Sequence, residues 1–193
     1  MDILDQAIAY ATKMHSGQIR KMANTPYILH PMEVASIIGT MTDDREIMAA
    51  GLLHDTIEDC NADPREIRQL FGARVAALVQ SETEDRSSTR SAEDTWQERK
   101  EESLIVLSMT HDIGVKILWL GDKLSNIRSF ARAYRKQGDA IFQLLHQKDP
   151  KIQGWYYKSI AAGLAELKDT DAFHEYCALV KEVFGEDGME QWN

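Results

Sequence analysis

Apolar residues recur at a spacing of three or four along most of the chain, which is the period of an amphipathic helix. Residues 2–15 show it first, with apolar positions that include Ile3, Ala7, Ala11 and Met14. The same reasoning predicts a helix from Pro31, one capped at Thr42 or Asp43 that continues through residue 59, one from Asp63-Pro64 and one after Gly72. Further helices are predicted around Trp96 and at residues 112–134, 139–147, 152–167 and 171–184.

Strand and repeat signals are missing from the sequence, which contains no alternating apolar segment of useful length. Residues 81–94 are polar and rich in Ser and Thr, which is typical of a surface loop, and they form the only candidate for an internal boundary. The pattern therefore predicts an all-α helical bundle without a significant sheet. We expect one domain over residues 1–187 and a frayed tail over residues 188–193.

Composition and charge narrow the class of protein. The chain has 193 residues and a formal net charge of -9, which disfavours nucleic-acid binding. Its N-terminus lacks the pattern of a secretory signal, and its most apolar run, residues 115–121, is too short to span a bilayer. Cys60 and Cys177 do not make a disulfide framework. We expect a cytoplasmic protein that binds neither membrane nor nucleic acid, and the sequence leaves the oligomeric state open.

Four ionisable residues directly follow an apolar segment in GLLHDTIED, residues 51–59. On a helix, His54 and Glu58 share one face, and Asp55 and Asp59 share another. Such groups are costly to bury unless they are paired or bound to a metal. The alternative is a helix end that runs into solvent.

Two more segments offer metal ligands. Asp122 lies within the strongly apolar residues 117–128, where burial would neutralise it unless a cation kept it ionised. That cation could be a metal, Lys123 next to it, or a distant Arg. His30 precedes a predicted helix start, where a histidine can also serve as a cap or a packing residue.

Together the three segments supply two imidazoles and two carboxylates, from His30, His54, Asp55 and Asp122. Such a mixed set of nitrogen and oxygen donors suits Mn²⁺, Fe²⁺ or Zn²⁺. A metal with open positions can polarise a phosphoryl group and lower the pKa of a bound water. The combination predicts a metal-dependent hydrolase.

The order of these residues resembles that of the HD superfamily of metal-dependent phosphohydrolases. MHSGQIRKMANTPYILHP, HDTIED and GDKLSNIR look like motifs of the hydrolase domain in RelA/SpoT homologues. The resemblance runs from about residue 3 to residue 160, and it is to the small, stand-alone alarmone hydrolases in particular. It departs from the family at Met22-Ala23-Asn24, which fills the place of an Asp-Gly pair, although Asn can adopt turn geometry.

The resemblance implies an activity. Members of this family use Mn²⁺ to remove the 3′-pyrophosphate from guanosine tetra- or pentaphosphate (ppGpp or pppGpp), giving GDP or GTP. His30, His54, Asp55 and Asp122 would be the metal ligands, with Mn²⁺ expected and other divalent ions able to bind.

The resemblance also implies roles for other residues. Glu58 and Asp59 would act on the attacking water, Arg20 would lie against the nucleobase with Lys21 close by, and Asn126 would contact the ribose. Arg128, near Asn126 in the sequence, is a candidate phosphate contact, whereas Arg132 and Arg135 fit a solvated helix face.

Two other functions stay open. One is a phosphohydrolase for another nucleotide, such as an adenosine-based alarmone or a nucleoside monophosphate. The other is a non-catalytic module that senses the alarmone, although such a module would not need Glu58 and Asp59.

Some other residues could be mistaken for parts of the site. His111-Asp112 is a second His-Asp pair, but it lacks trailing acids, and Asp112 fits a helix cap. His15 is expected to brace the loop after the first helix. Cys60 has no basic neighbour in the sequence to activate it, which argues against a thiol nucleophile.

Overall fold

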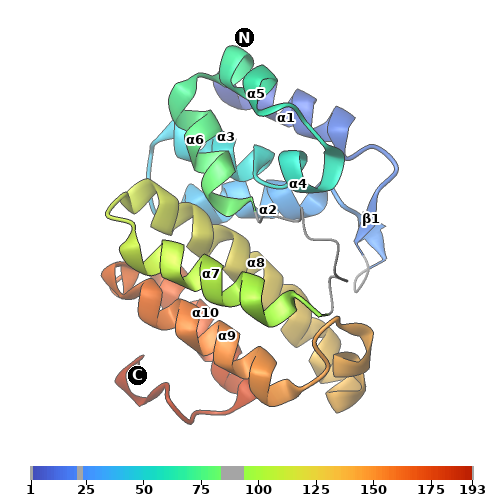
Figure 1. Cartoon of the computed structure of the whole chain (residues 1–193), viewed down its shortest axis with the longest axis vertical. Coiled ribbons are helices and arrows are strands. Elements are labelled where there is room, and N and C mark those ends of the chain that lie inside the picture. Colours follow the sequence, from blue (N-terminus) through green and yellow to red (C-terminus); the bar gives the residue numbers. More distant parts are fainter. Residues whose placement is uncertain (1, 21–23, 84–93, 193) are drawn as a thin grey trace. The chain divides into compact units, whose positions relative to one another are not determined.

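The computed structural model describes residues 2–20, 24–83 and 94–192, and it is mostly helical over these ranges (Figure 1). The predicted all-α fold is confirmed. The one small sheet pairs β1 (Ile19–Arg20) with β2 (Thr25–Pro26) in antiparallel fashion. Lys21 and most of the predicted loop at 81–94 lie outside the described residues.

The chain divides into two compact units. The first comprises Met1–Thr83 and Asp112–Ser125, and the second comprises Glu84–His111 and Asn126–Asn193. Helix α8 (Ile113–Gln137) begins in the first unit and ends in the second. The single domain predicted for residues 1–187 stays a prediction.

The first unit is a cluster of helices around α3 (Arg45–Leu53), which packs against α1, α2 and α6 (Figure 1). The other helices of this unit are α1 (Ile3–Met14), α2 (Leu29–Ile38), α4 (Thr56–Cys60), α5 (Pro64–Phe71), α6 (Ala73–Glu82) and the first part of α8. Most of α3 is buried because its second half, from Ala49 to Leu53, contains only small or apolar side chains. This apolar helix ends directly before His54.

Aspartate caps begin several helices of the first unit. Asp63 accepts a hydrogen bond from the Arg65 backbone N–H and is followed by Pro64 at the first helical position, as predicted. The cap of α3 is Asp44 rather than the predicted Thr42 or Asp43. Thr42, two residues earlier, instead accepts a hydrogen bond from the backbone N–H of the capping Asp44 at 3.1 Å.

Two glycines allow α2 to approach its neighbours closely. A Cβ atom on Gly51 of α3 would lie 2.5 Å from Ile38 Cδ1 and 3.3 Å from Val34 Cγ1. A Cβ atom on Gly121 of α8 would lie 2.9 Å from Ile38 Cγ1. Since both contacts are shorter than van der Waals packing allows, the glycines let α3 and α8 lie against the same face of α2.

The predicted continuous helix through residue 59 is wrong at His54 and Asp55. Helix α3 ends at Leu53, and α4 begins at Thr56. The hydroxyl of Thr56 donates to the Leu53 carbonyl at 2.6 Å, and His54 Nδ1 lies 2.8 Å from the Gly51 carbonyl oxygen. These side chains satisfy carbonyls at the end of α3, so the chain can change direction there. The break places the His-Asp pair at a junction between helices.

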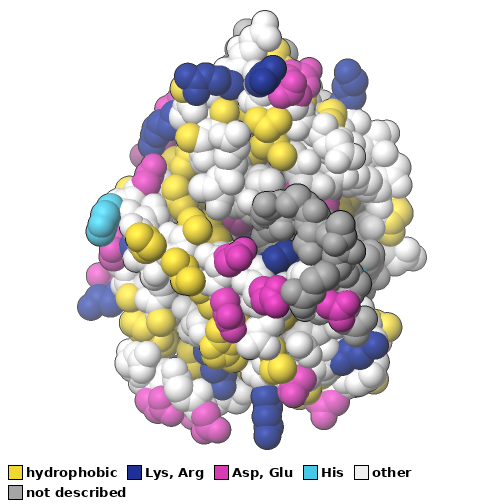
Figure 2. Space-filling view, viewed as in Figure 1, with side chains coloured by type: hydrophobic (Ala, Val, Ile, Leu, Met, Phe, Trp, Pro, Cys, Tyr) yellow, Lys and Arg dark blue, Asp and Glu magenta, His cyan; other side chains and the backbone are white. Residues whose placement is uncertain are grey.

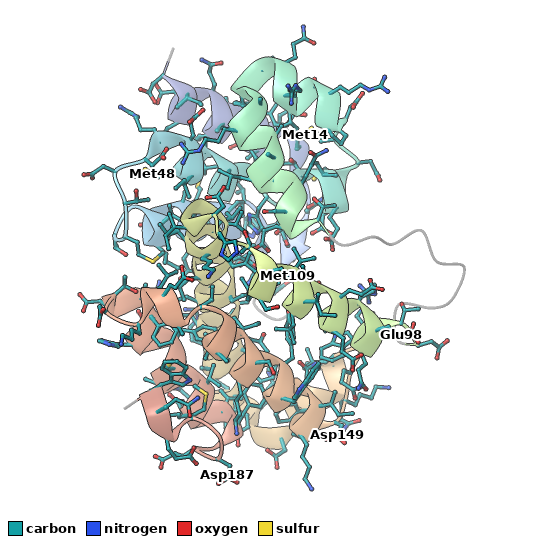
Figure 3. All side chains as sticks on the ribbon, turned by 60° about the vertical axis from the view of Figure 1, so that its left-hand side comes forward. Met14, Met48, Glu98, Met109, Asp149 and Asp187 are labelled. Carbon is teal, nitrogen blue, oxygen red and sulfur yellow. The ribbon has the colours of Figure 1, made fainter. Side chains whose placement is uncertain are left out.

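The second unit contains α7 (Trp96–Met109), the end of α8, α9 (Pro150–Gly163) and α10 (Asp171–Phe184), with short 3₁₀ segments η1 (Gly138–Leu144), η2 (Ala165–Leu167) and η3 (Glu190–Trp192). Helix α9 packs against α7 and α10. Asp149, labelled at the start of α9 in Figure 3, caps that helix by accepting from the Lys151 backbone N–H. Phe130, Phe142 and Phe184 pack against one another in its core.

The α-helix predicted at 139–147 is instead the 3₁₀ segment η1. Gly138 has φ +56°, which ends α8 in the left-handed region that glycine adopts easily. A short segment after such a turn closes more readily with the tighter 3₁₀ hydrogen bonds.

No helix within the described ranges has both the length and the apolar character that crossing a membrane requires. On the face drawn in Figure 2, basic side chains are interspersed with acidic ones.

Candidate metal centre

Four donor atoms of the first unit form a closed ring. His30 Nε2 lies 3.1 Å from Asp122 Oδ1 and 3.5 Å from Asp55 Oδ2. His54 Nε2 lies 3.0 Å from Asp55 Oδ2 and 3.5 Å from Asp122 Oδ1. Histidines and aspartates therefore alternate around the ring. The four residues come from α2, from the junction between α3 and α4, and from α8.

The spacing of these atoms fits ligands of a single ion. With metal–ligand bonds of about 2.0–2.2 Å, two ligands at an angle of about 90–110° lie roughly 2.8–3.6 Å apart. All four neighbouring distances fall within that range. His30, His54 and Asp122 are buried, and their donor atoms lie within 4.8 Å of one another. These three residues have the spacing of a possible metal site, and Asp55, the fourth predicted ligand, stays a prediction.

His54 shows most clearly that the centre is prepared for a cation. Its Nδ1 atom lies 2.8 Å from the Gly51 carbonyl oxygen, which can only accept, so Nδ1 carries a proton. Its Nε2 atom is buried and makes no hydrogen bond. This nitrogen faces the ring, 3.0 Å from Asp55 Oδ2, and a metal bound there could take both atoms as ligands.

The charges of the centre are strongly coupled. Burial lowers the pKa of His54, but Asp55 and Asp122 outweigh it and hold that pKa well above its usual value. Burial raises the pKa of Asp55, but His54 and His30 outweigh it and hold the pKa well below its usual range. The carboxylates are therefore kept ionised, which is the state that binds a metal.

The second oxygen of Asp122 is held by a cation of the protein. Lys123 Nζ lies 2.5 Å from Asp122 Oδ2 and 3.3 Å from Glu82 Oε2. It also lies 4.7 Å from the centre of the Trp119 ring. The pairing of Asp122 with Lys123 and its position in the ring thus coexist, because each uses a different oxygen.

Tyr27 is a member of the centre that the sequence did not predict. Its hydroxyl donates to Asp55 Oδ2 at 2.7 Å. Burial, followed by the negative charges of Asp55 and Asp59, raises the pKa of Tyr27 far above its usual value, so the hydroxyl keeps its proton. Its place in TPYILHP, one turn before His30, was the signal that could have identified it.

The predicted catalytic acids lie on α4. Glu58 is half-buried and Asp59 is exposed. After burial and the charge of Asp55, the negative charge of Asp59 also raises the pKa of Tyr27. Gln18 Nε2 donates to the Asp59 backbone carbonyl at 3.3 Å, which fixes the end of α4 to the loop after α1.

The predicted nucleotide contacts come from both units, since Arg20 belongs to the first and Asn126 and Arg128 to the second. Arg20 lies on β1, with its guanidinium carbon 5.9 Å from the centre of the Tyr27 ring. Asn24 adopts φ +50° and donates its backbone N–H to the Arg20 carbonyl at 2.9 Å. The predicted turn geometry of this Asn is confirmed. Lys21 lies outside the described residues.

The other predicted contacts lie on α8. Asn126 lies one turn after Asp122 on this helix. Arg128 forms a two-pronged ion pair with Glu175 of α10, through Nε at 2.6 Å and Nη2 at 2.5 Å. Arg135 pairs with Glu182 in the same way, with both contacts at 2.6 Å. Arg128 is therefore engaged by a carboxylate of its own unit.

The remaining candidates have structural roles. Asp112 caps α8 by accepting from the Gly114 backbone N–H, as predicted. His15 is buried, with Nδ1 2.8 Å from Gln18 Oε1, in the bracing position that was expected. Cys60, predicted to lack a basic neighbour, has one in the folded chain, because His15 Nδ1 lies 3.3 Å from its sulfur. Burial nevertheless raises the pKa of Cys60, so its thiol stays protonated.

Comparisons with known proteins agree with this geometry. Residues 7–150 match the family model described as HD domain. A GTP pyrophosphokinase from Myxococcus xanthus is 39% identical over 131 residues, which are 67% of this chain and 17% of that protein. A putative chloroplastic GTP diphosphokinase, RSH1, from Arabidopsis thaliana is 35% identical over 177 residues, which are 86% of this chain and 20% of that protein. The chain thus spans a fifth or less of these curated relatives.

Two solved structures match over nearly their whole length. The protein lmo0812 from Listeria monocytogenes EGD-e is 31% identical with a TM-score of 0.70, and the match covers 80% of this chain and 98% of that one. A metazoan orthologue of SpoT, described as hydrolysing ppGpp, is 25% identical with a TM-score of 0.72, and the match covers 98% and 97%.

Proposed function

This chain belongs to the HD domain family, and we propose that it is a Mn²⁺-dependent hydrolase that removes the 3′-pyrophosphate of ppGpp and pppGpp. The observation that carries the proposal is the ring of alternating histidine and aspartate donors, with neighbouring distances of 3.0–3.5 Å. The substrate is supported by the metazoan orthologue of SpoT that hydrolyses ppGpp.

Hydrolysis is favoured over synthesis by the coverage of the matches. The relatives named for GTP pyrophosphokinase activity are much longer, and the chain spans 17–20% of them. The orthologue described as a hydrolase is matched over 97% of its length. The ring of donors lies within the HD domain match at residues 7–150.

The metal would be held by His30, His54, Asp55 and Asp122. When bound, such an ion polarises a phosphoryl oxygen and lowers the pKa of a water molecule. The contribution of the chain is to keep both carboxylates ionised and both Nε2 atoms directed into the ring. The Tyr27 hydroxyl donates to Asp55 and the Lys123 ammonium pairs with Asp122. Each contact limits how that carboxylate can turn.

Glu58 and Asp59 would act on the attacking water molecule. One of these carboxylates orients the water and accepts its proton as the oxygen adds to the phosphorus attached to the ribose 3′ oxygen. The bond between that phosphorus and the 3′ oxygen breaks, and the ribose oxygen takes up a proton. The products are pyrophosphate and GDP, or GTP when the substrate is pppGpp.

The nucleotide would be held by Arg20, Lys21, Asn126 and Arg128. A planar guanidinium stacks well on a flat ring, so Arg20 suits a contact with the base. Its position over Tyr27, which itself donates to Asp55, links the base contact to the metal ligands through one side chain.

Product analysis tests the proposal. Purified protein is incubated with ppGpp, pppGpp or the adenosine analogue, each with Mn²⁺ or with a chelator. We expect pyrophosphate and GDP or GTP from the guanosine substrates with Mn²⁺ and none with the chelator. His54→Ala should abolish the activity. His111→Ala, which alters the other His-Asp pair of the chain, should retain it.

Other results would assign a different function. Turnover of the adenosine analogue or of a nucleoside monophosphate while ppGpp stays intact would identify a phosphohydrolase for another nucleotide. Tight binding of ppGpp by the Mn²⁺-loaded protein without any turnover would identify a sensing module.

A further inference from the structure

A chain of polar side chains leads away from the metal centre behind His30. His30 Nδ1 lies 2.8 Å from Ser125 Oγ, and the Ser125 hydroxyl donates to Glu33 Oε2 at 2.7 Å. Ser125 is fully buried and His30 is 3% exposed, so their contact is shielded from water, whereas Glu33 is partly exposed. Neither Glu33 nor Ser125 is among the residues assigned to the centre above.

The hydroxyl proton of Ser125 decides where the proton of His30 lies. An ionised carboxylate only accepts hydrogen bonds, so the single hydroxyl proton of Ser125 points at Glu33. The Ser125 oxygen can then only accept from His30, which requires a proton on Nδ1. The lone pair of the neutral ring is therefore on Nε2, the atom that lies 3.1 Å from Asp122 Oδ1.

Helical spacing brings the four side chains together. His30 and Glu33 are three residues apart on α2, and Asp122 and Ser125 are three residues apart on α8. Residues at this spacing lie on one face of a helix. The close approach of the two helices at Gly121 lets one pair contact the other.

His54 reaches the same tautomer by another route. Its Nδ1 atom faces the carbonyl oxygen of Gly51, which belongs to the backbone. His30 Nδ1 instead faces the side chain of Ser125, which is held in turn by the side chain of Glu33. Substitutions can therefore disturb His30 while the arrangement of His54 is left intact.

We propose that Glu33 and Ser125 are positioning residues for the metal, which fix the proton of His30 on Nδ1 and direct Nε2 into the ring of donors. The proposal rests on the metal site of the proposed function and deepens it. Residues that orient a histidine ligand in this way typically change metal affinity by about 10- to 100-fold when they are removed.

Metal affinity measured without substrate tests the proposal. Mn²⁺ titration, followed by electron paramagnetic resonance of the free ion, gives the dissociation constants of the wild type, Ser125→Ala, Glu33→Gln and the double variant. We expect Ser125→Ala to weaken binding by about 10- to 100-fold. Glu33→Gln, which leaves a neutral acceptor, should weaken it less. Because Glu33 acts through Ser125, Glu33→Gln should have no further effect in the Ser125→Ala background.

The tautomer of His30 is a second readout that needs no metal. Nitrogen-15 resonances of the metal-free wild type at alkaline pH should show His30 protonated on Nδ1. In Ser125→Ala this preference should weaken for His30 and persist for His54. Ser129→Ala removes a buried serine one turn further along α8 and should leave both the affinity and the tautomer unchanged.

The outcomes separate this proposal from the proposed function. Wild-type affinity in Ser125→Ala, with the His30 proton still on Nδ1, would overturn the positioning role while leaving ppGpp hydrolysis untouched. Conversely, a protein that binds Mn²⁺ with the expected dependence on Ser125 but does not hydrolyse ppGpp would retain the positioning role and lose the proposed function.

Discussion

Glu82 is a buried carboxylate near the proposed metal centre, and one of its oxygens lacks a hydrogen bond. Its side chain is 3% exposed, and its Oε1 atom has no hydrogen-bond partner. Burial raises its pKa to about 7, although Lys123, 3.3 Å away, opposes that shift. A carboxylate with a raised pKa binds its proton more tightly in the folded state than in the unfolded state. Its contribution to stability is therefore fully present below its usual pKa and is lost as the pH rises through about 7.

Glu82→Gln should make the stability of the metal-free protein less dependent on pH. The glutamine cannot ionise, so the cost of a buried charge is removed above neutral pH. Between about pH 5 and pH 8, the unfolding free energy of the wild type should fall by roughly 2 kcal/mol relative to the variant. Urea denaturation in the presence of a chelator measures this difference. The exposed Glu102→Gln should follow the wild type, and parallel curves for the wild type and Glu82→Gln would contradict the prediction.

Residues that contact the donors, or the neighbours of the donors, were harder to predict than the donors themselves. The four donors follow from residue type and order, because two imidazoles and two carboxylates within apolar segments already indicate a metal. Tyr27, Ser125 and Glu82 are ordinary residues in the sequence. Their roles come from contacts across 28, 95 and 41 positions of the chain, to Asp55, His30 and Lys123. A one-dimensional pattern contains no information on such distances.

The close contact of α2 with α3 depends on Gly51 and on the Cδ1 methyl group of Ile38. A Cβ atom on Gly51 would meet Ile38 Cδ1 at 2.5 Å, within a core where Ile38 is fully buried. His30 lies on the same helix as Ile38, and His54 follows α3 directly. Packing at Gly51 therefore bears on the distance between His30 and His54, two of the proposed metal ligands.

Gly51→Ala should therefore destabilise the protein even though alanine favours helices. Overpacking a core costs about 1–3 kcal/mol, which exceeds the gain in helix propensity of about 1 kcal/mol. Ile38→Val removes the clashing Cδ1 atom, so Gly51→Ala should cost less in that background than in the wild type. Chemical denaturation of the four proteins gives the coupling energy.

Gly39→Ala is the control for this pair. Its Cβ atom would lie no closer than 3.4 Å to any atom, and Gly39 has φ -62°, so the variant should be at least as stable as the wild type. Equal costs of Gly51→Ala with and without the Ile38 methyl group would show that the close approach is relieved elsewhere.

Two matched ion pairs join α8 to α10 and allow the predicted role of Arg128 to be tested. Arg128 and Arg135 are seven residues apart, as are their partners Glu175 and Glu182. Since all four side chains are partly exposed, each pair should contribute little to stability. Arg128→Ala and Arg135→Ala should lower the unfolding free energy by similar small amounts.

Only Arg128→Ala should change the kinetics if Arg128 contacts the phosphates. We expect an increase in KM for ppGpp in Arg128→Ala and an unchanged KM in Arg135→Ala. Identical KM values for the two variants would limit Arg128 to its ion pair with Glu175. The sequence could not reveal this competition, because Glu175 lies 47 residues away in a separate helix.

The order and type of the helices were predicted because their apolar periodicity is strong. The errors fell where side chains or single residues redirect the backbone. The break after Leu53 results from hydrogen bonds of His54 and Thr56 to the carbonyls of α3. The 3₁₀ segment after α8 follows from the left-handed conformation of Gly138. Such local competition does not alter the hydrophobic period, so the period could not report it.

At the scale of the whole molecule, α8 is the element that belongs to both compact units. Its first part carries Asp122 and buries Leu118 and Leu120, and its later part buries Ile127 and Phe130. To unfold one unit alone, the protein would have to break this helix within a continuous hydrogen-bonded segment. We therefore expect the two units to unfold together, which is what the predicted single domain requires.

Binding of Mn²⁺ to the first unit should then stabilise the entire chain. At a free Mn²⁺ concentration of about 100 times the dissociation constant, the stabilisation is about 2.7 kcal/mol. For a chain of this size, that corresponds to an increase in Tm of roughly 5–10 °C. Calorimetry should show one transition that moves as a whole, and hydrogen exchange should slow in the most protected amides of α9 and α10 as well as in those of α2 and α3. His54→Ala should show neither change.

If Mn²⁺ slowed exchange in α2 and α3 alone, and calorimetry resolved two transitions of which only one moved, the single domain would be wrong. The centre would then stabilise an independently folding unit.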